Sequence, residues 1–174
     1  MPPRLLVVDR RRLTKNSCWS KTPPHVLQQY ALLADGERGV VVGPRGDYCW
    51  MCLPRRHSGA VFNSLLGGDG VYAFAPDLPR FVWGGYYEQR SLIWHSRWVT
   101  TDGIVECREA LALPTDTHTA VLLCHIHGVD GQPRLHIALD VCADYGNHAM
   151  SDVSHGASHG HPVRSAPIPL DRSR

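Results

Sequence analysis

Long apolar segments are missing from this 174-residue sequence. No stretch approaches the roughly 20 apolar residues that a transmembrane helix needs. The only apolar run near the N-terminus, Leu5 to Val8, is far shorter than the roughly 7–15 residues of a signal-peptide core. We therefore expect a cytoplasmic protein that does not associate with a membrane.

Catalytic and cofactor-binding motifs are missing as well. The sequence contains no Gly-x-Ser-x-Gly elbow, P-loop, Rossmann fingerprint or His-Glu-x-x-His. Glu37, Glu88, Glu106 and Glu109 lie beside turns or within predicted strands, where ordinary surface positions account for them. Because Glu106 and Glu109 are three residues apart in a strand, they face opposite sides. The sequence predicts neither a self-contained catalytic site nor a cofactor.

A basic stripe along the chain is also missing. Positive charge is concentrated in residues 1–25, where six Lys and Arg side chains face one Asp, and the rest of the chain carries about −3. Nothing in the middle of the chain continues this charge into a nucleic-acid footprint. We expect a disordered basic leader over residues 1–27 and no nucleic-acid partner.

What the sequence does contain is many turns, with 16 Gly and 13 Pro between short apolar runs. Asp102-Gly103 and Asp130-Gly131 supply the backbone conformations that hairpins need. From Ser91 to Thr100, alternation places Trp94 and Trp98 on one face, which we expect to pack inward. Nine strands are predicted: Tyr30–Leu33, Val40–Val42, Tyr48–Leu53, Val71–Ala75, Phe81–Tyr87, Ser91–Thr100, Ile104–Leu113, Thr119–Gly128 and Pro133–Ala143.

This pattern predicts an all-β fold, an antiparallel β-sandwich, over residues 28–147. The segment Ala60–Leu66 alone is typical of a helical turn or two. From residue 148 to 174 the sequence turns to His, Ser, Gly and Pro, which predicts a disordered tail.

Two groups of residues in the sequence are of types that bind metals: a pair of cysteines and a triplet of histidines. Cys49-x-x-Cys52 lies between a Gly-Pro-Arg-Gly turn and Pro54, which favours a strand, where the two thiols face opposite sides. Cys49 is then expected beside Met51, and Cys52 beside Tyr48 and Trp50. His125, His127 and His136 form a triplet that could bind a metal, although a solvent-facing strand also explains it. We expect no metal site, and keep a metal-binding β protein as the weaker alternative.

The stretch from Trp50 to Ser58 carries the candidate binding residues. Aromatic faces cover the apolar patches of sugars, and planar or hydroxyl groups bind their hydroxyls. A core tryptophan followed by a solvated loop explains the stretch equally well. The candidate carbohydrate-facing residues are Trp50, Arg55, His57 and Ser58. An alternative function is a stand-alone carbohydrate-binding module that uses Trp50, Trp83, Trp94 and Trp98.

The order of these segments resembles the N-terminal, trehalase-like β-sandwich domain of bacterial glycoside hydrolase family 15 proteins, the glucoamylase and trehalase-like enzymes. The resemblance covers roughly residues 28–147, with "DVCADYG" near its close. The residues that carry it are Tyr30, Ala31, Leu32, Asp35, Gly36, Trp50, Cys52, Leu53, Pro54, Arg55, Ser58, Phe62, Leu65 and Leu66.

The resemblance implies that this domain packs against a catalytic (α/α)6 barrel, which carries two glutamates that hydrolyse α-glucosidic bonds with inversion. The barrel is absent from this chain, so we expect a truncated, supersandwich-like domain that is inactive alone. An α-glucoside or trehalose is the implied ligand. The chain departs from the family pattern at Arg56, His57 and Gly59, where the family has Phe, Asp and Pro. A histidine cannot replace a carboxylate that accepts hydrogen bonds from sugar hydroxyls.

Overall fold

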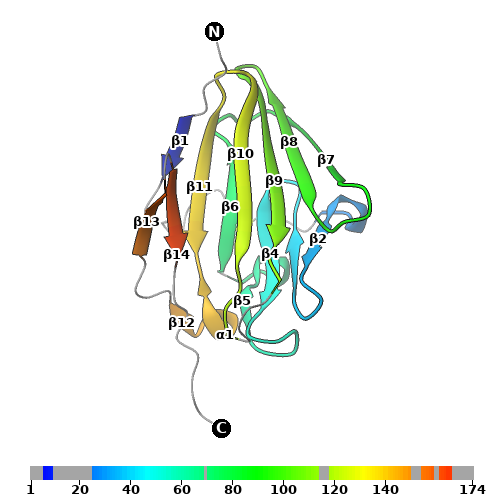
Figure 1. Cartoon of the computed structure of the whole chain (residues 1–174), viewed down its shortest axis with the longest axis vertical. Helices are drawn as coiled ribbons and strands as arrows, with labels where there is room; N and C mark the ends of the chain where they lie inside the picture. Colours follow the sequence, from blue (N-terminus) through cyan, green and yellow to red (C-terminus); the bar gives the residue numbers. More distant parts are fainter. Residues whose placement is uncertain are drawn as a thin grey trace.

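The computed structural model describes residues 6–9, 25–68, 70–113, 118–149, 154–158 and 161–165. Two β-sheets lie face to face and enclose the core (Figure 1). Every strand pair within them is antiparallel except that of β1 and β11, which is parallel. The predicted all-β sandwich is confirmed. No helix of the described segments is long and apolar enough to cross a membrane.

The larger sheet has seven strands in the order β1-β11-β6-β4-β3-β2, with β5 paired to β4. Its strands are β1 (Leu6–Asp9), β2 (Ala31–Ala34), β3 (Gly39–Val42), β4 (Asp47–Cys52), β5 (Ala60–Phe62), β6 (Val71–Pro76) and β11 (Arg134–Asp140). The smaller sheet has the order β10-β9-β8-β7. Its strands are β7 (Val82–Tyr87), β8 (Trp94–Thr100), β9 (Gly103–Leu111) and β10 (Leu122–Gly131).

Short elements complete the fold. They are the 3₁₀ helices η1 (Leu27–Gln29) and η2 (Ser64–Leu66), the helical turn α1 (Ala143–Gly146), β12 (His148–Ala149), and the hairpin of β13 (Ser154–Ser158) and β14 (His161–Ser165). Most of the predicted leader (1–27) and tail (148–174) lies outside the described residues. Their disorder and the exact domain limits stay predictions.

Each of the nine predicted strands overlaps a strand of the structure. Two turn glycines are required by close contact: a Cβ on Gly103 would lie 2.2 Å from the Asp130 carbonyl oxygen, and one on Gly131 would lie 2.3 Å from that of Asp102. The Asp-Gly signals therefore mark real turns, because only glycine lets these two backbones approach each other.

The core is aromatic and lies between the sheets. Trp98, Tyr48 and Phe74 are fully buried, and Trp94 is nearly so. The inward packing predicted for Trp94 and Trp98 is confirmed. Tyr48 stands edge-on to Phe74, with ring centroids 5.7 Å apart. Such edge-to-face pairs add stabilisation beyond the buried area alone.

Two local predictions were wrong. Ala60–Leu66 is not helical at its start, because β5 pairs with β4 there, with Phe62 opposite Met51, and only Ser64–Leu66 forms a 3₁₀ turn. The pairing of β3 with β4 shifts register between Val41 and Val42, which face Trp50 and Tyr48, so β4 carries one extra residue at Cys49. As a result Tyr48 joins Met51 in the core cluster rather than sharing a face with Trp50.

One hydroxyl joins the open edges of the two sheets. The Tyr87 hydroxyl accepts a hydrogen bond from the Leu32 backbone N–H at 2.6 Å and donates one to the Leu32 carbonyl at 3.2 Å. Leu32 belongs to β2, the edge strand of the larger sheet. Unpaired edge groups of this kind are where foreign strands add to a sheet.

We expect Tyr87→Phe to lower the free energy of unfolding by about 1 kcal/mol, since two backbone groups lose their protein partner. We also expect it to increase self-association through the freed β2 edge. Urea denaturation and size-exclusion chromatography measure the two effects. Tyr145→Phe is the matched control, because no hydrogen bond involves that hydroxyl within the described residues; equal behaviour of both variants would contradict the proposed edge role.

Candidate functional site

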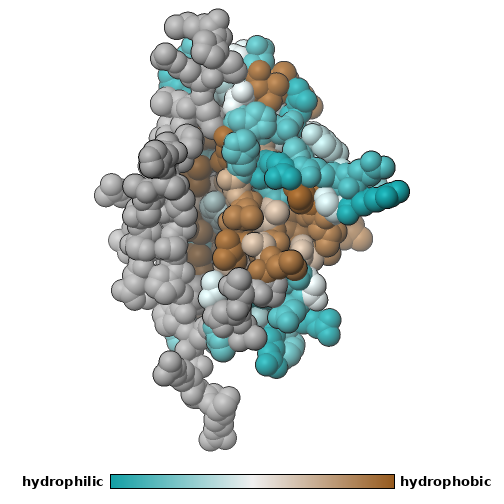
Figure 2. Space-filling view, in the orientation of Figure 1, coloured by the Kyte–Doolittle hydropathy of each residue, from teal (hydrophilic) through white to brown (hydrophobic). Residues whose placement is uncertain are grey.

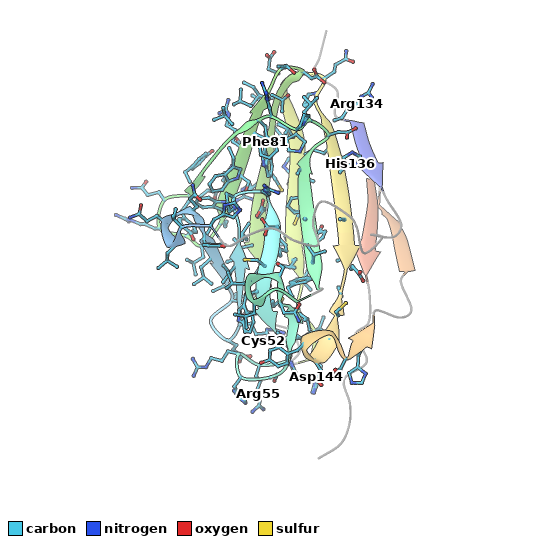
Figure 3. All side chains as sticks on the ribbon, turned by 180° about the vertical axis from the view of Figure 1, so that it is seen from behind. Cys52, Arg55, Phe81, Arg134, His136 and Asp144 are labelled. Atoms are coloured by element: carbon cyan, nitrogen blue, oxygen red, sulfur yellow. The ribbon has the colours of Figure 1, made fainter. Side chains whose placement is uncertain are left out.

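The candidate sugar-facing residues lie at one end of the sandwich, where β4 runs into the loop of residues 53–59. Trp50 is half-buried, Ser58 is partly buried, and Arg55 and His57 are exposed. Figure 3 shows Cys52, Arg55 and Asp144 near this end, while Phe81, Arg134 and His136 lie at the opposite one. The structure therefore places the four candidates on one loop and the strand that leads into it.

The loop is closed by its own hydrogen bonds. The Ser58 N–H donates to the Arg55 carbonyl at 3.0 Å, and the Arg55 N–H donates to the Ser58 hydroxyl at 3.2 Å. Leu53 and Gly59 meet across the base of the loop, where the Leu53 N–H donates to the Gly59 carbonyl at 3.4 Å. These bonds hold the backbone that presents Arg55, Arg56 and His57 to solvent.

A second segment, residues 143–147, packs against this loop. A Cβ on Gly59 would lie 2.8 Å from a carboxyl oxygen of Asp144, so the two backbones touch. The Asn147 side-chain amide donates to the other Asp144 carboxyl oxygen at 3.1 Å. A Cβ at position 59 would also lie 3.0 Å from the Asp144 Cα, so a larger residue here would crowd the second segment.

The backbone of the second segment is strained. Asp144 has φ of 49° and Tyr145 has φ of 56°, so two consecutive residues other than glycine adopt the left-handed region. Such conformations cost on the order of 1–3 kcal/mol each and cluster at functional sites. Here the strain sets a 55% exposed tyrosine beside Trp50, with ring centroids 6.3 Å apart and a 51° angle between planes.

Together the two segments form what we call the Trp50–Tyr145 end: Trp50, Arg55, Arg56, His57, Ser58, Asp144, Tyr145 and Asn147. It combines two aromatic rings, hydrogen-bond donors and a carboxylate. Sequence reasoning missed Asp144, Tyr145 and Asn147. The Asp-Tyr-Gly-Asn run contained a signal, because Asp and Asn tolerate left-handed backbone and often stand in such turns.

The other tryptophans do not form a sugar platform. Trp94 and Trp98 are buried, and Trp83 is half-buried and packs against Trp94 with centroids 6.2 Å apart. The carbohydrate-binding alternative needs several exposed, coplanar indoles. Burial therefore removes Trp94 and Trp98 from that set, whereas Trp50 and Trp83 are each half-buried and only Trp50 has the exposed Tyr145 ring beside it.

The histidine triplet is not brought together. His125 and His127 stack on β10 with centroids 5.4 Å apart, whereas His136 lies on β11 in the other sheet and bonds to Asp77. Among the described residues no group of three His, Cys, Asp or Glu side chains has the arrangement of a metal site. Cys49 and Cys52 are both buried free thiols, and burial raises the pKa of the Cys49 thiol to about 12.

A polar network covers the outer face of the smaller sheet. His95 bonds through one ring nitrogen to Glu88 at 2.8 Å and through the other to Glu106 at 2.9 Å. Partial burial acts to lower the pKa of His95, but these two bonds outweigh it and raise the pKa. Arg108 binds both oxygens of Glu88, and its bonds, followed by that of His95, lower the Glu88 pKa to about 2.

Glu109 overturns the expectation of ordinary surface glutamates. Its side chain is fully buried between the sheets, and neither carboxyl oxygen has a hydrogen-bond partner within the described residues. Burial raises the pKa of Glu109 from 4.5 to about 8, Cys124 adds to the rise, and nearby Ser96, Cys107 and Tyr48 oppose it only in part. Glu106 faces the opposite side of the sheet from Glu109, as predicted. There it forms ion pairs with His95 and Arg97.

Comparison with known proteins shows similarity to trehalases and to a domain family described as trehalase-like. Residues 16–154 match the family described as "Trehalase-like, N-terminal". A trehalase of Mycobacterium tuberculosis is 32% identical over 92 residues, which cover 52% of this chain and 13% of that protein. A trehalase of Mycolicibacterium smegmatis is 30% identical over 92 residues, which cover 52% of this chain and 14% of that protein.

The match thus spans a small part of these relatives, and no solved structure matches the chain significantly. The family match nevertheless extends over both segments of the Trp50–Tyr145 end and over every strand of the two packed sheets except β1. The chain belongs to the trehalase-like N-terminal domain family.

Proposed function

We propose that this chain is the N-terminal domain of a glycoside hydrolase of family 15, of the glucoamylase or trehalase-like kind. In this role it supports the hydrolysis of α-glucosidic bonds by a separate catalytic (α/α)6 barrel. The observation that carries the proposal is the family match across the sandwich, together with two similar proteins that are named trehalases. The proposal retains a cytoplasmic location, because the thiols of Cys49, Cys52, Cys107 and Cys124 are free, as expected in a reducing compartment.

The carboxylates of the sandwich support a non-catalytic role. An inverting glycosidase needs one carboxylic acid and one carboxylate about 6.5–9.5 Å apart on either side of the bond to be cut. Glu88 and Glu106 are bound by His95 and Arg side chains, and Glu109 is sealed in the core. None of these three described glutamates is free to serve as such an acid or base on a bound sugar.

An exposed apolar area supports the proposal that the sandwich packs against another domain. Figure 2 shows apolar atoms gathered toward the lower middle of the face on which β10 lies. Exposed apolar side chains near the end of β9 and the start of β10 include Leu113, Val121 and Leu123, with exposures of 79%, 44% and 53%. Contiguous apolar surface of this kind is typical of an interface with another domain or protein.

We expect the isolated chain to release no glucose from trehalose or maltose. We also expect it to restore soluble, active enzyme when it is co-expressed with a Mycobacterium tuberculosis trehalase that lacks its own matching segment. Glucose release in the soluble fraction is the measurement, and Trp98→Ala, whose core is disrupted, is the control. Hydrolysis by the isolated chain would contradict the inactive role, and failure of rescue, both in trans and as a fusion, would contradict the supporting role.

A further inference from the structure

The Trp50–Tyr145 end carries a positive edge that its aromatic rings do not explain. Arg55 and Arg56 are consecutive and exposed, and His57 follows them. Within the described part of the chain, no carboxylate forms an ion pair with any of the three. Arg45, Arg80, Arg90 and Arg134 also have no ion pair among the described residues, but only Arg55 and Arg56 are consecutive and stand beside the two exposed rings.

The backbone that carries these donors is held by the loop's own hydrogen bonds. The reciprocal Arg55–Ser58 bonds close the turn, and Gly59 anchors its far side against Asp144. A closed turn that presents two guanidinium groups suits an oxyanion, because guanidinium donors match phosphate, sulfate or carboxylate oxygens with two parallel hydrogen bonds.

The neighbouring segment supplies the complementary surface for a sugar ring. Tyr145 is exposed beside Trp50, and its left-handed backbone is strained, which is expected where a side chain must be held for a purpose. The Asp144 carboxylate repels an anion but accepts hydrogen bonds from hydroxyl groups. An elongated ligand would therefore place its hydroxyls toward Asp144 and its charged group toward Arg55 and Arg56.

We propose that the Trp50–Tyr145 end is a binding site for a carbohydrate that carries an oxyanion, of which a phosphorylated sugar is the best match. The sugar ring stacks on Tyr145 and Trp50, and the two arginines bind the phosphate. The inference rests on the proposed function for the nature of the sugar, an α-glucoside. It goes beyond that function because two consecutive, exposed guanidinium groups add a site for a charged group beside the sugar-facing rings.

The test is isothermal titration calorimetry of the full chain with three probes: trehalose 6-phosphate, trehalose and inorganic phosphate. We expect trehalose 6-phosphate to bind at least about tenfold more tightly than either of the others, since one paired guanidinium–phosphate contact contributes a difference of this order. A glucuronate-containing disaccharide separates phosphate recognition from general binding of anionic sugars. Equal binding of the phosphorylated and uronic sugars would overturn the preference for phosphate.

Variants locate the site. Arg55→Gln with Arg56→Gln should weaken trehalose 6-phosphate binding at least about tenfold. Tyr145→Ala should weaken trehalose 6-phosphate binding and leave the binding of inorganic phosphate unchanged. The matched control is Arg80→Gln with Arg134→Gln, a pair of exposed arginines outside the two loops, with Arg134 at the opposite end of the sandwich (Figure 3). Unchanged thermal midpoints establish that each variant is folded.

Several outcomes would overturn the proposal. Inorganic phosphate that binds as tightly as the sugar phosphate would reveal an anion site without sugar recognition. Equal binding of neutral trehalose, no binding at all, or equal losses in the double variant and its control would each reject the site. The supporting role in hydrolysis would survive these results, because its rescue assay uses neutral trehalose and does not depend on Arg55 or Arg56.

Discussion

Asp35→Ala is expected to lower the free energy of unfolding by roughly 3–5 kcal/mol, because it leaves a buried guanidinium without its counter-charge. The side chains of Asp35 and Arg38 are both fully shielded from solvent, and the Arg38 Nε donates to Asp35 at 2.9 Å. Arg38 also donates to the Thr119 carbonyl at 2.6 Å, which ties the β2–β3 turn to the segment before β10. Urea denaturation measures the loss.

The control for this prediction is Glu37→Ala, since Glu37 is an exposed neighbour in the same turn and should change stability by less than about 0.5 kcal/mol. Asp35→Ala combined with Arg38→Met should recover most of the loss, because it removes both charges from the interior. A loss below about 1 kcal/mol for the single variant would mean that water reaches the arginine.

The pH dependence of this pair follows from the carboxyl pKa. Burial acts to raise the pKa of Asp35, but hydrogen bonds from the Arg38 and Glu37 backbone N–H groups and from the Arg38 side chain together lower it below 3.8. The contribution of Asp35 is therefore fully present above pH 3.8 and is lost as the pH falls through the folded-state pKa. The Asp35→Ala variant should lack this part of the acid transition.

The strands could be predicted from the sequence because the residues at each turn and the alternation within each strand mark their limits. Asp102-Gly103 and Asp130-Gly131 fix their turns by glycine geometry, and the alternation around Trp94 and Trp98 fixes an inward face. The bulge near Cys49 could not be predicted in this way, since an extra residue leaves no mark in composition. It moved Tyr48 to the core and separated it from Trp50.

The candidate site was predicted only in part, for a similar reason. Trp50, Arg55, His57 and Ser58 are continuous with one strand and its loop, so a local reading of the sequence finds them. Tyr145 comes from a segment far along the chain that meets this part of the molecule through tertiary contacts such as that of Gly59 with Asp144. The Asp-Tyr-Gly-Asn run indicates a turn, but a tyrosine is not expected in left-handed backbone, so the run does not predict that Tyr145 lies beside Trp50.

The burial of Glu109 was within reach of the sequence and was missed. Val105, Cys107 and Leu111 share its alternation in β9, and all three are buried. A residue that sits between apolar neighbours of the same parity faces inward whatever its charge. The usual preference of glutamate for the surface predicts an exposed carboxyl, whereas the strand period predicts a buried one, and the strand period gives the correct position.

Glu109→Gln is expected to stabilise the protein at pH 8 by about 2–4 kcal/mol and to leave it little changed at pH 4. The folded-state pKa of about 8 lies above the ordinary value of 4.5, so between these values the folded protein keeps a proton that the unfolded chain releases. Stability therefore falls as the pH rises from 4.5 to about 8 and changes no further above it. Each unit of pH in this range costs about 1.4 kcal/mol at most.

The glutamine keeps the shape of the side chain but cannot ionise. The stability of the Glu109→Gln variant should therefore not show the fall between pH 4.5 and about 8 that the Glu109 carboxyl causes. Urea denaturation of both proteins at pH 5, 6, 7 and 8 measures the difference, which isolates Glu109 from other titrating groups. Glu37→Gln, at an exposed position, should keep the wild-type slope. Parallel pH profiles for the wild type and Glu109→Gln would show that the carboxyl is ionised at neutral pH, which requires water or a cation inside the sandwich to solvate the charge that burial otherwise excludes.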